Sequence, residues 1–438
     1  MDMIGLVKRA GVVGAGGAGF PTHVKLYAKV DTVLANGAEC EPLLYSDQFV
    51  MLGRTDEIVD GLLAVMRATG AEKGIICVKE KNHDAIQEFE KRIASHKNIS
   101  IFGLGNFYPS GDEQILVNEV TGRIVPEAGL PLNVGVVVQN VATLANIARA
   151  LKGEPVTSRV VTVGGEIKIP GVHVVPIGTS VAEVISRCGG PLLEKHAVLL
   201  NGPMMGKLIE PQNEVITKTT GGVFILPPDN PLVMRMSRPL EADIRLSRGS
   251  CEQCRYCTDF CPRFLQGHSL QPHLIMRVMN EQRDPEAATV TNSFLCCECG
   301  VCDLFACPAM LSPRRFYREF KKSLGARGIR FVPSKKDFIP DAHREYRRVP
   351  KDKLTRRLAL SRYDIKPDFH GAPWDVDKVE IPLSMHLGAP SAPVVKVGDR
   401  VKPGQPIAAI PEGKLGAAIH ASIGGTITKA NGMIRIER

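Results

Sequence analysis

The sequence predicts a multidomain α/β protein, and three features of its 438 residues support that prediction. The first is its length, since a single hydrophobic core rarely serves a chain of this size. The second is an alternation of strand-like apolar runs with amphipathic helices up to residue 156. The third is a change near Ser158, where short strands separated by glycine turns begin. Two cysteine runs between Cys251 and Pro308 then interrupt both patterns.

The first predicted domain covers residues 1–156. Val30–Ala35 and Gly74–Val78 are apolar runs of strand length, whereas Thr55–Arg67 and His83–Ile93 place their apolar residues at helical spacing. Strands that alternate with helices in this way favour a parallel sheet covered by helices. We therefore expect a Rossmann-like α/β domain at the start of the chain.

A glycine-rich loop precedes the first of these strands. It contains Gly14, Gly16, Gly17 and Gly19, and Lys25 follows it. Glycines let main-chain N–H groups close around a phosphate, and a nearby lysine can neutralise the charge. No clear strand precedes the loop, so the pattern alone fits a structural glycine turn equally well.

Polar residues follow predicted strands elsewhere in this domain. Asn36, Glu39 and Glu41 come after the first strand, where α/β sheets place their ligand-binding loops. Together with the glycine loop they predict a ligand site in this domain.

These stretches resemble a family of NADH-linked flavoproteins. It includes the flavin subunit of respiratory complex I, the C subunit of the membrane Rnf complex and the cobalamin reductases of propanediol-utilising microcompartments. The resemblance implies bound FMN, with NADH as electron donor. It places around the FMN the residues Gly14, Gly16, Gly17, Lys25, Asn36, Glu39, Asn140 and Thr143. It places at the nicotinamide side Tyr108 and the expected catalytic residues Phe20, Glu41 and Glu113. Ala38 departs from complex I, which carries an aspartate there.

The second predicted module, residues 157–235, is built from short strands and glycine turns. Its predicted elements are the strands Arg159–Val163, Gly171–Val175, Ala197–Leu200 and Gly221–Leu226 and the helix Val181–Arg187. The pattern resembles the soluble-ligand-binding β-grasp module that follows the flavin domain in the same family. We expect it to act as a structural spacer that carries the cysteine region toward the flavin.

The third module, residues 236–330, is predicted to be an α-helical ferredoxin-type domain. Each of its two cysteine runs has a C-x-x-C-x-x-C core and a later Cys-Pro pair, and the second run is one residue longer. In bacterial ferredoxins with this spacing, the fourth cysteine of each run ligates the other cluster. The predicted ligands of the first [4Fe–4S] cluster are Cys251, Cys254, Cys257 and Cys307, and those of the second are Cys296, Cys299, Cys302 and Cys261.

Two structural zinc sites are the alternative for these cysteines. Zinc modules usually separate their C-x-x-C pairs more widely and do not favour the Cys-Pro ending, so the spacing favours iron–sulfur clusters. Cys297 fits neither cluster in this register. It is interpreted either as a spare ligand or as a small core residue.

Residues 331–380 form a predicted linker, and residues 381–438 a predicted barrel-sandwich module. From Arg314 to Arg362 there are 17 Lys and Arg against 5 Asp and Glu, within a net charge of +9 for the chain. This stretch fits either a solvated wrapping or a docking face for an acidic partner or anionic cofactor. The final module resembles lipoyl and biotinyl carriers, but Lys414 lacks their usual methionine neighbour, so we expect no acylation.

The composition and the absence of certain motifs limit the locations and partners that we expect for this protein. No apolar run reaches the length of a membrane span, and the first residues lack the features of a signal peptide, which favours a cytoplasmic protein. Nine of the twelve cysteines lie in the two runs, as expected in a reducing compartment that loads metal clusters. No recognition motif accompanies the basic stretch, so we expect no nucleic-acid partner.

The order of the domains along the chain favours one of the related families over the others. In the Rnf protein the barrel-sandwich module precedes the flavin loop, whereas here it follows, as in the microcompartment reductases. The resemblance therefore implies an NADH-dependent cobalamin reductase in a bacterial microcompartment, with an adenosyltransferase and shell or cargo proteins as partners. The alternatives are an Rnf-type subunit that passes electrons between NADH and ferredoxin, and a non-enzymatic ferredoxin-like adaptor. A flavin accepts electron pairs and releases single electrons to clusters, which favours an enzyme.

Overall fold

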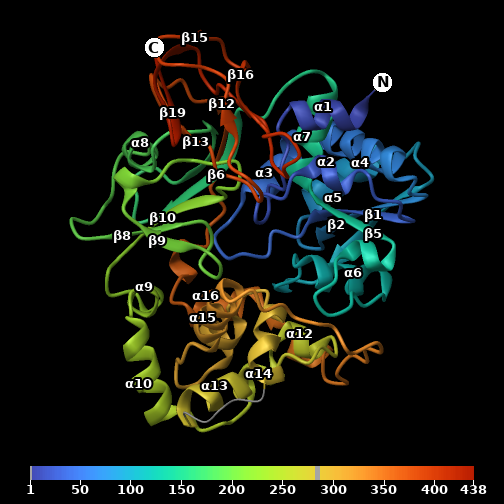
Figure 1. Ribbon diagram of the computed structural model, residues 1–438, viewed down its shortest axis with the longest axis vertical. Coiled ribbons are helices and arrows are strands. Elements are labelled where there is room, and N and C mark those ends of the chain that lie inside the picture. The colour runs from blue at the N-terminus through green and yellow to red at the C-terminus, as the bar shows by residue number, and fades with distance from the viewer. Residues whose placement is uncertain (1, 282–286) are drawn as a thin grey trace.

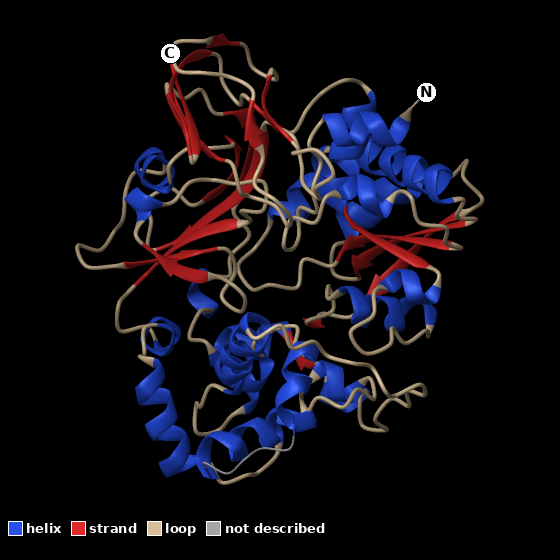
Figure 2. Cartoon of the chain, viewed as in Figure 1, coloured by secondary structure: helices blue, strands red, loops and turns tan. Residues whose placement is uncertain are grey.

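The computed structural model describes residues 2–281 and 287–438. In Figure 1 the N-terminal α/β domain lies beside the β-grasp and C-terminal β modules, and the helical cysteine region lies below them. Figure 2 shows the same division, with both strands and helices in the upper part and mostly helices and loops in the lower part. The cysteine region therefore contacts the other modules from one side.

The N-terminal domain contains a four-stranded parallel sheet in the order β3-β2-β1-β5. Because β2 and β5 pair with opposite edges of β1, the strand order reverses there and creates a topological switch point. The four strands of the sheet are β1 (Thr32–Gly37), β2 (Lys73–Lys79), β3 (Ile99–Leu104) and β5 (Val136–Asn140). A further short strand, β4 (Phe107–Tyr108), lies outside this sheet. The helices are α1 (Met3–Arg9), α2 (Thr22–Lys25), α3 (Ser46–Gly53), α4 (Thr55–Thr69), α5 (His83–Ile93), α6 (Glu113–Thr121) and α7 (Val141–Leu151).

Capping residues set the ends of several of these helices. The side chains of Asp112 and Asn140 accept hydrogen bonds from the first turns of α6 and α7, and Gly70, in the left-handed conformation, ends α4. The predicted helix at Thr55–Arg67 is confirmed and extends by two residues, and the one at His83–Ile93 has the predicted bounds. Local sequence therefore accounts for this domain well.

The β-grasp module is a six-stranded sheet in the order β12-β7-β6-β10-β8-β9. Its own strands and helix, all predicted except β9, are β6 (Ser158–Gly165), β7 (Gly171–Pro176), α8 (Val181–Arg187), β8 (Ala197–Leu200), β9 (Lys207–Ile209) and β10 (Gly222–Leu226). The edge strand β12 (Asp368–Pro373) comes from much later in the chain and pairs in parallel with β7. A distant segment thus covers one edge of the sheet.

The cysteine region is helical, as predicted, and its helices are short because cysteine loops separate them. They are α9 (Pro231–Met236), α10 (Leu240–Ser250), α11 (Tyr256–Asp259), α12 (Pro262–Leu265), α13 (Pro272–Glu281), α14 (Ala287–Thr291), the π-helical turn η4 (Val301–Ala306) and α15 (Pro313–Ala326). A small core that includes Leu270, Ile275, Phe316 and Tyr317 lies among them.

The segment predicted as a linker contains short elements that pair with other modules. β11 (Val349–Pro350) pairs with β4, and α16 (Lys351–Arg357) follows it. Both Arg344 and Arg348 form ion pairs with Glu119 of α6. Much of the basic stretch is therefore bound within the chain, which favours the wrapping interpretation over a docking face.

The C-terminal module consists of two small sheets, in the orders β13-β19-β18-β15 and β14-β16-β17. Alternate residues Val379, Ile381, Ile434 and Ile436 are buried between them, as a half-buried strand pattern requires. The strands are β13 (Lys378–Pro382), β14 (Ala392–Pro393), β15 (Arg400–Val401), β16 (Pro406–Ala409), β17 (Ile419–His420), β18 (Gly425–Asn431) and β19 (Met433–Glu437).

One ion pair joins the N-terminal domain to the cysteine region. Arg263, directly after Cys261-Pro262, donates two hydrogen bonds to the Asp112 carboxylate, at 2.7 and 2.8 Å. Both side chains are largely buried. Burial alone would raise the pKa of Asp112, but the Arg263 guanidinium holds that pKa below its ordinary value. The pair therefore favours the docked arrangement of the two modules at neutral pH.

Replacing Arg263 by Met tests this contact. The change leaves the Asp112 carboxylate buried without its cation, so we expect a loss of about 3–5 kcal/mol of unfolding free energy. The double variant Arg263→Met/Asp112→Asn should recover part of the loss, because it contains no unpaired buried charge. Denaturant unfolding of the loaded protein measures both. In the wild type this stabilisation should be present above pH ~4 and disappear as the pH falls through the lowered pKa of Asp112.

Candidate active site

The glycine-rich loop forms a hairpin with an open tip. Val13 and Pro21 form a β-bridge, and the N–H of Gly14 donates to the carbonyl of the half-buried Phe20 at 2.9 Å. Residues 16–18 are exposed at the tip, and their N–H groups donate no hydrogen bond to any residue that the structure describes. Adjacent free N–H groups in such a loop suit a phosphate.

The loop packs on the carboxyl end of β5, beside the switch point. The N–H of Ala15 donates to Thr143 Oγ1 at 2.9 Å. A β-carbon at Gly16 would lie 3.1 Å from Asn140 Nδ2, so the loop and this asparagine are in close contact. The structure thus brings Gly16, Asn140 and Thr143, all predicted FMN residues, to the edge where α/β sheets bind ligands.

Lys25 and Asn36 extend this edge. Lys25 Nζ donates to the carbonyl of Val138 at 3.1 Å and pairs with Glu113 Oε1 at 2.8 Å. Asn36, near the end of β1, donates through Nδ2 to the carbonyl of Gly111 at 2.9 Å. Two predicted FMN residues therefore contact either the expected catalytic Glu113 or the loop that precedes it.

Glu39 caps helix α3 and lies beside a second carboxylate. It accepts hydrogen bonds from the N–H groups of Asp47 at 2.7 Å and Gln48 at 3.2 Å. Burial and the neighbouring Glu39 raise the pKa of Asp47 to about 7, although Asn140 donates to it at 2.7 Å. This acidic pair adjoins the glycine loop through Asn140.

Two residues expected at the nicotinamide side contact other modules. Glu41 accepts hydrogen bonds from the N–H groups of Met204 at 3.0 Å and Met205 at 2.8 Å in the β-grasp module. Burial raises the pKa of Glu41 to about 7. Tyr108 is buried, and its hydroxyl donates to the carbonyl of Cys299 at 2.7 Å. These loops of the α/β domain thus contact both the β-grasp module and the second cysteine run.

The second predicted ligand set surrounds a buried cavity. Cys261, Cys296, Cys299 and Cys302 line it, together with Cys297. In residues 2–281 and 287–438, no group of three Cys, His, Asp or Glu side chains is placed to hold a single metal ion. The cysteines are instead spread around the cavity, and Cys297 forms part of its wall.

The first predicted ligand set lies nearer the surface. Cys254 is exposed, whereas Cys251, Cys257 and Cys307 are half-buried. Burial, and after it the charges of Cys307, Cys254 and Cys251, raises the pKa of the Cys257 thiol to about 12. The N–H of Leu311 donates to Cys307 Sγ at 3.3 Å, and such bonds to sulfur help set cluster potentials.

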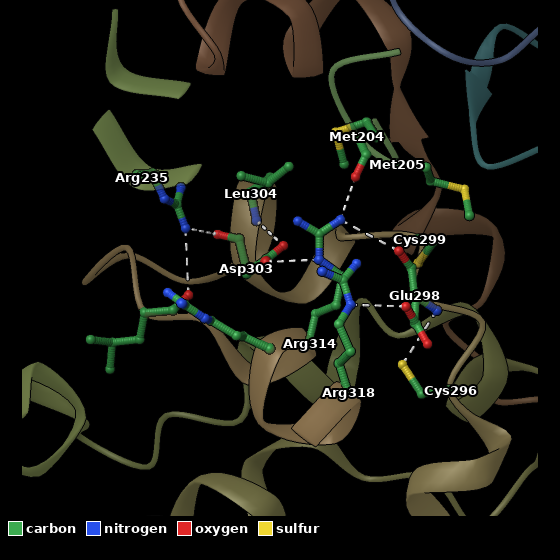
Figure 3. A network of polar contacts seen from close by, with 12 residues as sticks. Met204, Met205, Arg235, Cys296, Glu298, Cys299, Asp303, Leu304, Arg314 and Arg318 are labelled. Atoms are coloured by element: carbon green, nitrogen blue, oxygen red, sulfur yellow. Dashed lines mark hydrogen bonds and ion pairs between the residues drawn. The ribbon is translucent and has the colours of Figure 1, made fainter. Parts of the chain in front are cut away.

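Helix α15 connects the buried cavity to the β-grasp module (Figure 3). Arg314 pairs with Asp303 at 3.1 Å and donates to the carbonyls of Met204 and Glu298. Arg318 pairs with Glu298 at 3.1 Å. Each arginine is thus paired with a carboxylate, so these contacts hold the wall of the cavity in place without adding net charge beside it.

These features fit FMN and two [4Fe–4S] clusters. The free N–H groups and Lys25 match a monophosphate, and each half of the cysteine region supplies four sulfurs. Sequence reasoning missed Arg159 and Lys218, which donate to carbonyls of the segment from Gly11 to Ala15. Neither belongs to a local motif. A basic residue at the start of an apolar strand is the only signal for Arg159.

Comparison with known protein families gives four matches along the chain. The Nuo51 FMN-binding domain matches residues 7–149, the SLBB domain residues 160–208, the 4Fe–4S dicluster domain residues 250–312 and the RnfC barrel sandwich hybrid domain residues 374–436. The predicted fold class and the FMN and cluster cofactors are therefore confirmed.

Several known proteins are similar to this chain. Cobalamin reductase PduS of Citrobacter freundii is 41% identical over 97% of this chain and 93% of its own length. The PduS protein of Salmonella typhimurium is 43% identical over 96% and 93%. The C subunit of the Na⁺-translocating ferredoxin:NAD⁺ oxidoreductase complex of Acetobacterium woodii is 38% identical, over 60% of this chain and 58% of its own length.

A solved structure supports the fold. The NAD⁺-reducing [NiFe]-hydrogenase in its H₂-reduced state superposes with a TM-score of 0.50 at 22% identity, over 77% of this chain and 64% of that one. Among the described residues, no helix combines the length and apolar character needed to cross a lipid bilayer.

Replacing Lys25 by Ala tests the phosphate site. The change removes the lysine predicted to contact the FMN phosphate, so FMN binding should weaken by about 1.5–3 kcal/mol. Fluorescence titration of deflavinated protein measures the affinity. Lys29→Ala, an exposed lysine nearby, is the control and should leave the affinity unchanged. Equal affinities for both variants would remove Lys25 from the site.

Replacing Cys261 by Ser tests the crossed ligation. We expect the wild type to contain about eight irons and eight sulfides per chain. The variant should lose the signal of the cluster at Cys296, Cys299 and Cys302, although Cys261 lies in the other run. Cys254→Ser should affect only the other cluster. Paramagnetic resonance of the reduced proteins, with iron analysis, distinguishes the two. Loss of the Cys251 cluster alone in the Cys261 variant would refute the assignment.

Proposed function

The chain belongs to the family of the PduS cobalamin reductases, and from that premise we propose that it uses NADH to reduce cob(III)alamin to cob(I)alamin. This step would regenerate coenzyme B12 inside a bacterial microcompartment. The observation that carries the proposal is the similarity to these reductases along nearly the whole chain, which includes the flavin and dicluster regions. The chain is accordingly an oxidoreductase that transfers electrons by flavin and iron–sulfur groups.

The residues of the flavin domain would bind and orient the reactants. When bound, FMN accepts a hydride from NADH and passes electrons on singly, which suits one-electron clusters. The glycine loop and Lys25 hold the phosphate, while Asn140 and Thr143 fix the loop against β5. The Glu41 carboxylate, whose pKa burial raises to about 7, can hold or release a proton at neutral pH. The roles of Asn140 and Thr143 use contacts at one edge of the sheet, whereas Glu41 is held by main-chain groups of the β-grasp module.

The burial of the cysteines supports an order for the two clusters. The cavity lined by Cys261 and Cys299 adjoins the flavin domain, since Tyr108 bonds to Cys299 and Asp112 to Arg263. The other set includes the exposed Cys254. We therefore assign entry of electrons to the buried cluster and exit to the cluster near the surface.

The Rnf alternative is less well supported. Its barrel-sandwich module precedes the flavin loop, whereas here that module occupies residues 374–436, after the cysteine region. The similarity to Rnf proteins also covers a smaller part of the chain.

Cob(I)alamin is rapidly reoxidised, so direct transfer to an adenosyltransferase partner is favoured over its release. Shell or cargo proteins of the microcompartment would hold the reductase and the adenosyltransferase together.

An anaerobic assay tests the proposed function. Protein loaded with FMN and both clusters should convert cob(III)alamin to cob(I)alamin with NADH, followed by absorbance, and an added adenosyltransferase should trap the product as adenosylcobalamin. Protein that carries Cys254→Ser should still reduce its flavin with NADH but should lose cobalamin reduction, because its exit cluster is damaged.

The same assay distinguishes the alternatives. Suppose that NADH reduces the flavin of the loaded protein while cobalamin stays oxidised and ferredoxin turns over rapidly. The cobalamin assignment is then wrong, and the Rnf-type function replaces it. If NADH does not reduce the flavin at all, the chain acts only as an adaptor.

A further inference from the structure

A buried arginine of the β-grasp module holds the back of the glycine loop. Arg159, at the start of β6, donates through Nη2 to the carbonyl of Ala15 at 3.0 Å and through Nε to the carbonyl of Thr220 at 2.9 Å. The residue is 8% exposed. Ala15 is therefore fixed on both sides, because its N–H donates to Thr143 on the flavin domain.

A buried lysine of the same module holds the entrance to the loop. Lys218 donates through Nζ to the carbonyl of Gly11 at 2.6 Å and to the carbonyl of Ala418 at 2.7 Å. It is 2% exposed, and burial lowers its pKa to about 7. A β-carbon at Gly11 would lie 2.7 Å from Lys218 Nζ, so the two segments are in direct contact.

These two contacts determine which side of the loop carries main-chain N–H groups without an acceptor. Both cations bind main-chain carbonyls, at Gly11 and Ala15, from the side of the β-grasp module. In a tight glycine loop, carbonyls held on one side leave adjacent N–H groups free on the other, which is the arrangement that binds anions. The N–H groups of residues 16–18 have no acceptor in the part of the chain that the structure describes.

Arg159 also opposes a local excess of negative charge. Arg159 lies near Glu39 and Asp47, whose carboxylates adjoin the loop through Asn140. A phosphate bound at the tip would be repelled by these two acids. A buried guanidinium behind the loop offsets that repulsion more strongly than an exposed one, because solvent screens it less.

We propose that the β-grasp module completes the phosphate site of the flavin domain, with Arg159 and Lys218 as positioning residues. They fix the glycine loop in its anion-binding conformation, and Arg159 supplies positive charge behind it. The inference deepens the proposed function, since it rests on FMN binding at this loop. It assigns to the module a role beyond that of a spacer.

Comparing FMN with riboflavin tests the proposal, because riboflavin lacks the phosphate. Full-length protein with intact clusters is stripped of flavin, and each flavin is titrated by fluorescence. Arg159→Met and Lys218→Met should each raise the dissociation constant for FMN at least about tenfold. Riboflavin affinity should change less than about twofold. Lys195→Met removes an exposed lysine of the same module and should change neither.

The possible outcomes distinguish the positioning role of Arg159 and Lys218 from phosphate binding at the glycine loop. If wild-type protein binds riboflavin as tightly as FMN, the phosphate assignment fails. If the wild type prefers FMN and both Met variants behave like Lys195→Met, the site stands and the positioning role is refuted. Equal losses of FMN and riboflavin affinity would also refute it, since they indicate a merely structural effect. If Arg159→Met does not fold, Arg159→Lys and Lys218→Met decide by the same ratio.

Discussion

The electron path depends on one loop, Tyr108–Asp112, which joins the flavin domain to both cysteine runs. Tyr108 bonds to the carbonyl of Cys299 in the second run, and Asp112 binds Arg263 beside the last cysteine of the first. These partners lie 191 and 151 residues away in sequence. Separating the modules would break the two hydrogen bonds from Arg263 to Asp112 and the one from Tyr108 to Cys299. The loop therefore fixes the buried cluster cavity against the flavin domain.

Features that depend on residues close together in the sequence could be predicted from it. The cysteine spacing, the helix at His83–Ile93 and the glycine loop each depend on residues a few positions apart. The fold class followed from these patterns, and the family resemblance added FMN. The contacts of Glu41 with Met204 and Met205 were not predictable, since an isolated carboxylate carries no signal about a partner 163 residues away.

For the same reason, the sequence did not reveal how two other parts of the chain contact neighbouring modules. The segment after residue 331 reads as a basic linker because charge and proline dominate its composition, yet β11 and β12 pair with strands of two other modules. Such pairing uses main-chain groups, which composition does not reveal. The β-grasp module reads as a spacer because its strands are ordinary, whereas its function in this structure lies in two buried cations, Arg159 and Lys218, whose acceptors are main-chain carbonyls of another module.

Buried cations at a module boundary have a consequence for assembly. A lysine or arginine loses its hydration when the boundary closes, and the cost is recovered only if carbonyls or carboxylates are in place to accept its hydrogen bonds. Lys218 needs carbonyls from both the flavin domain and the C-terminal module, so its site is complete only when three modules are docked. With the role proposed for Lys218, tight FMN binding is then coupled to the docking of these three modules.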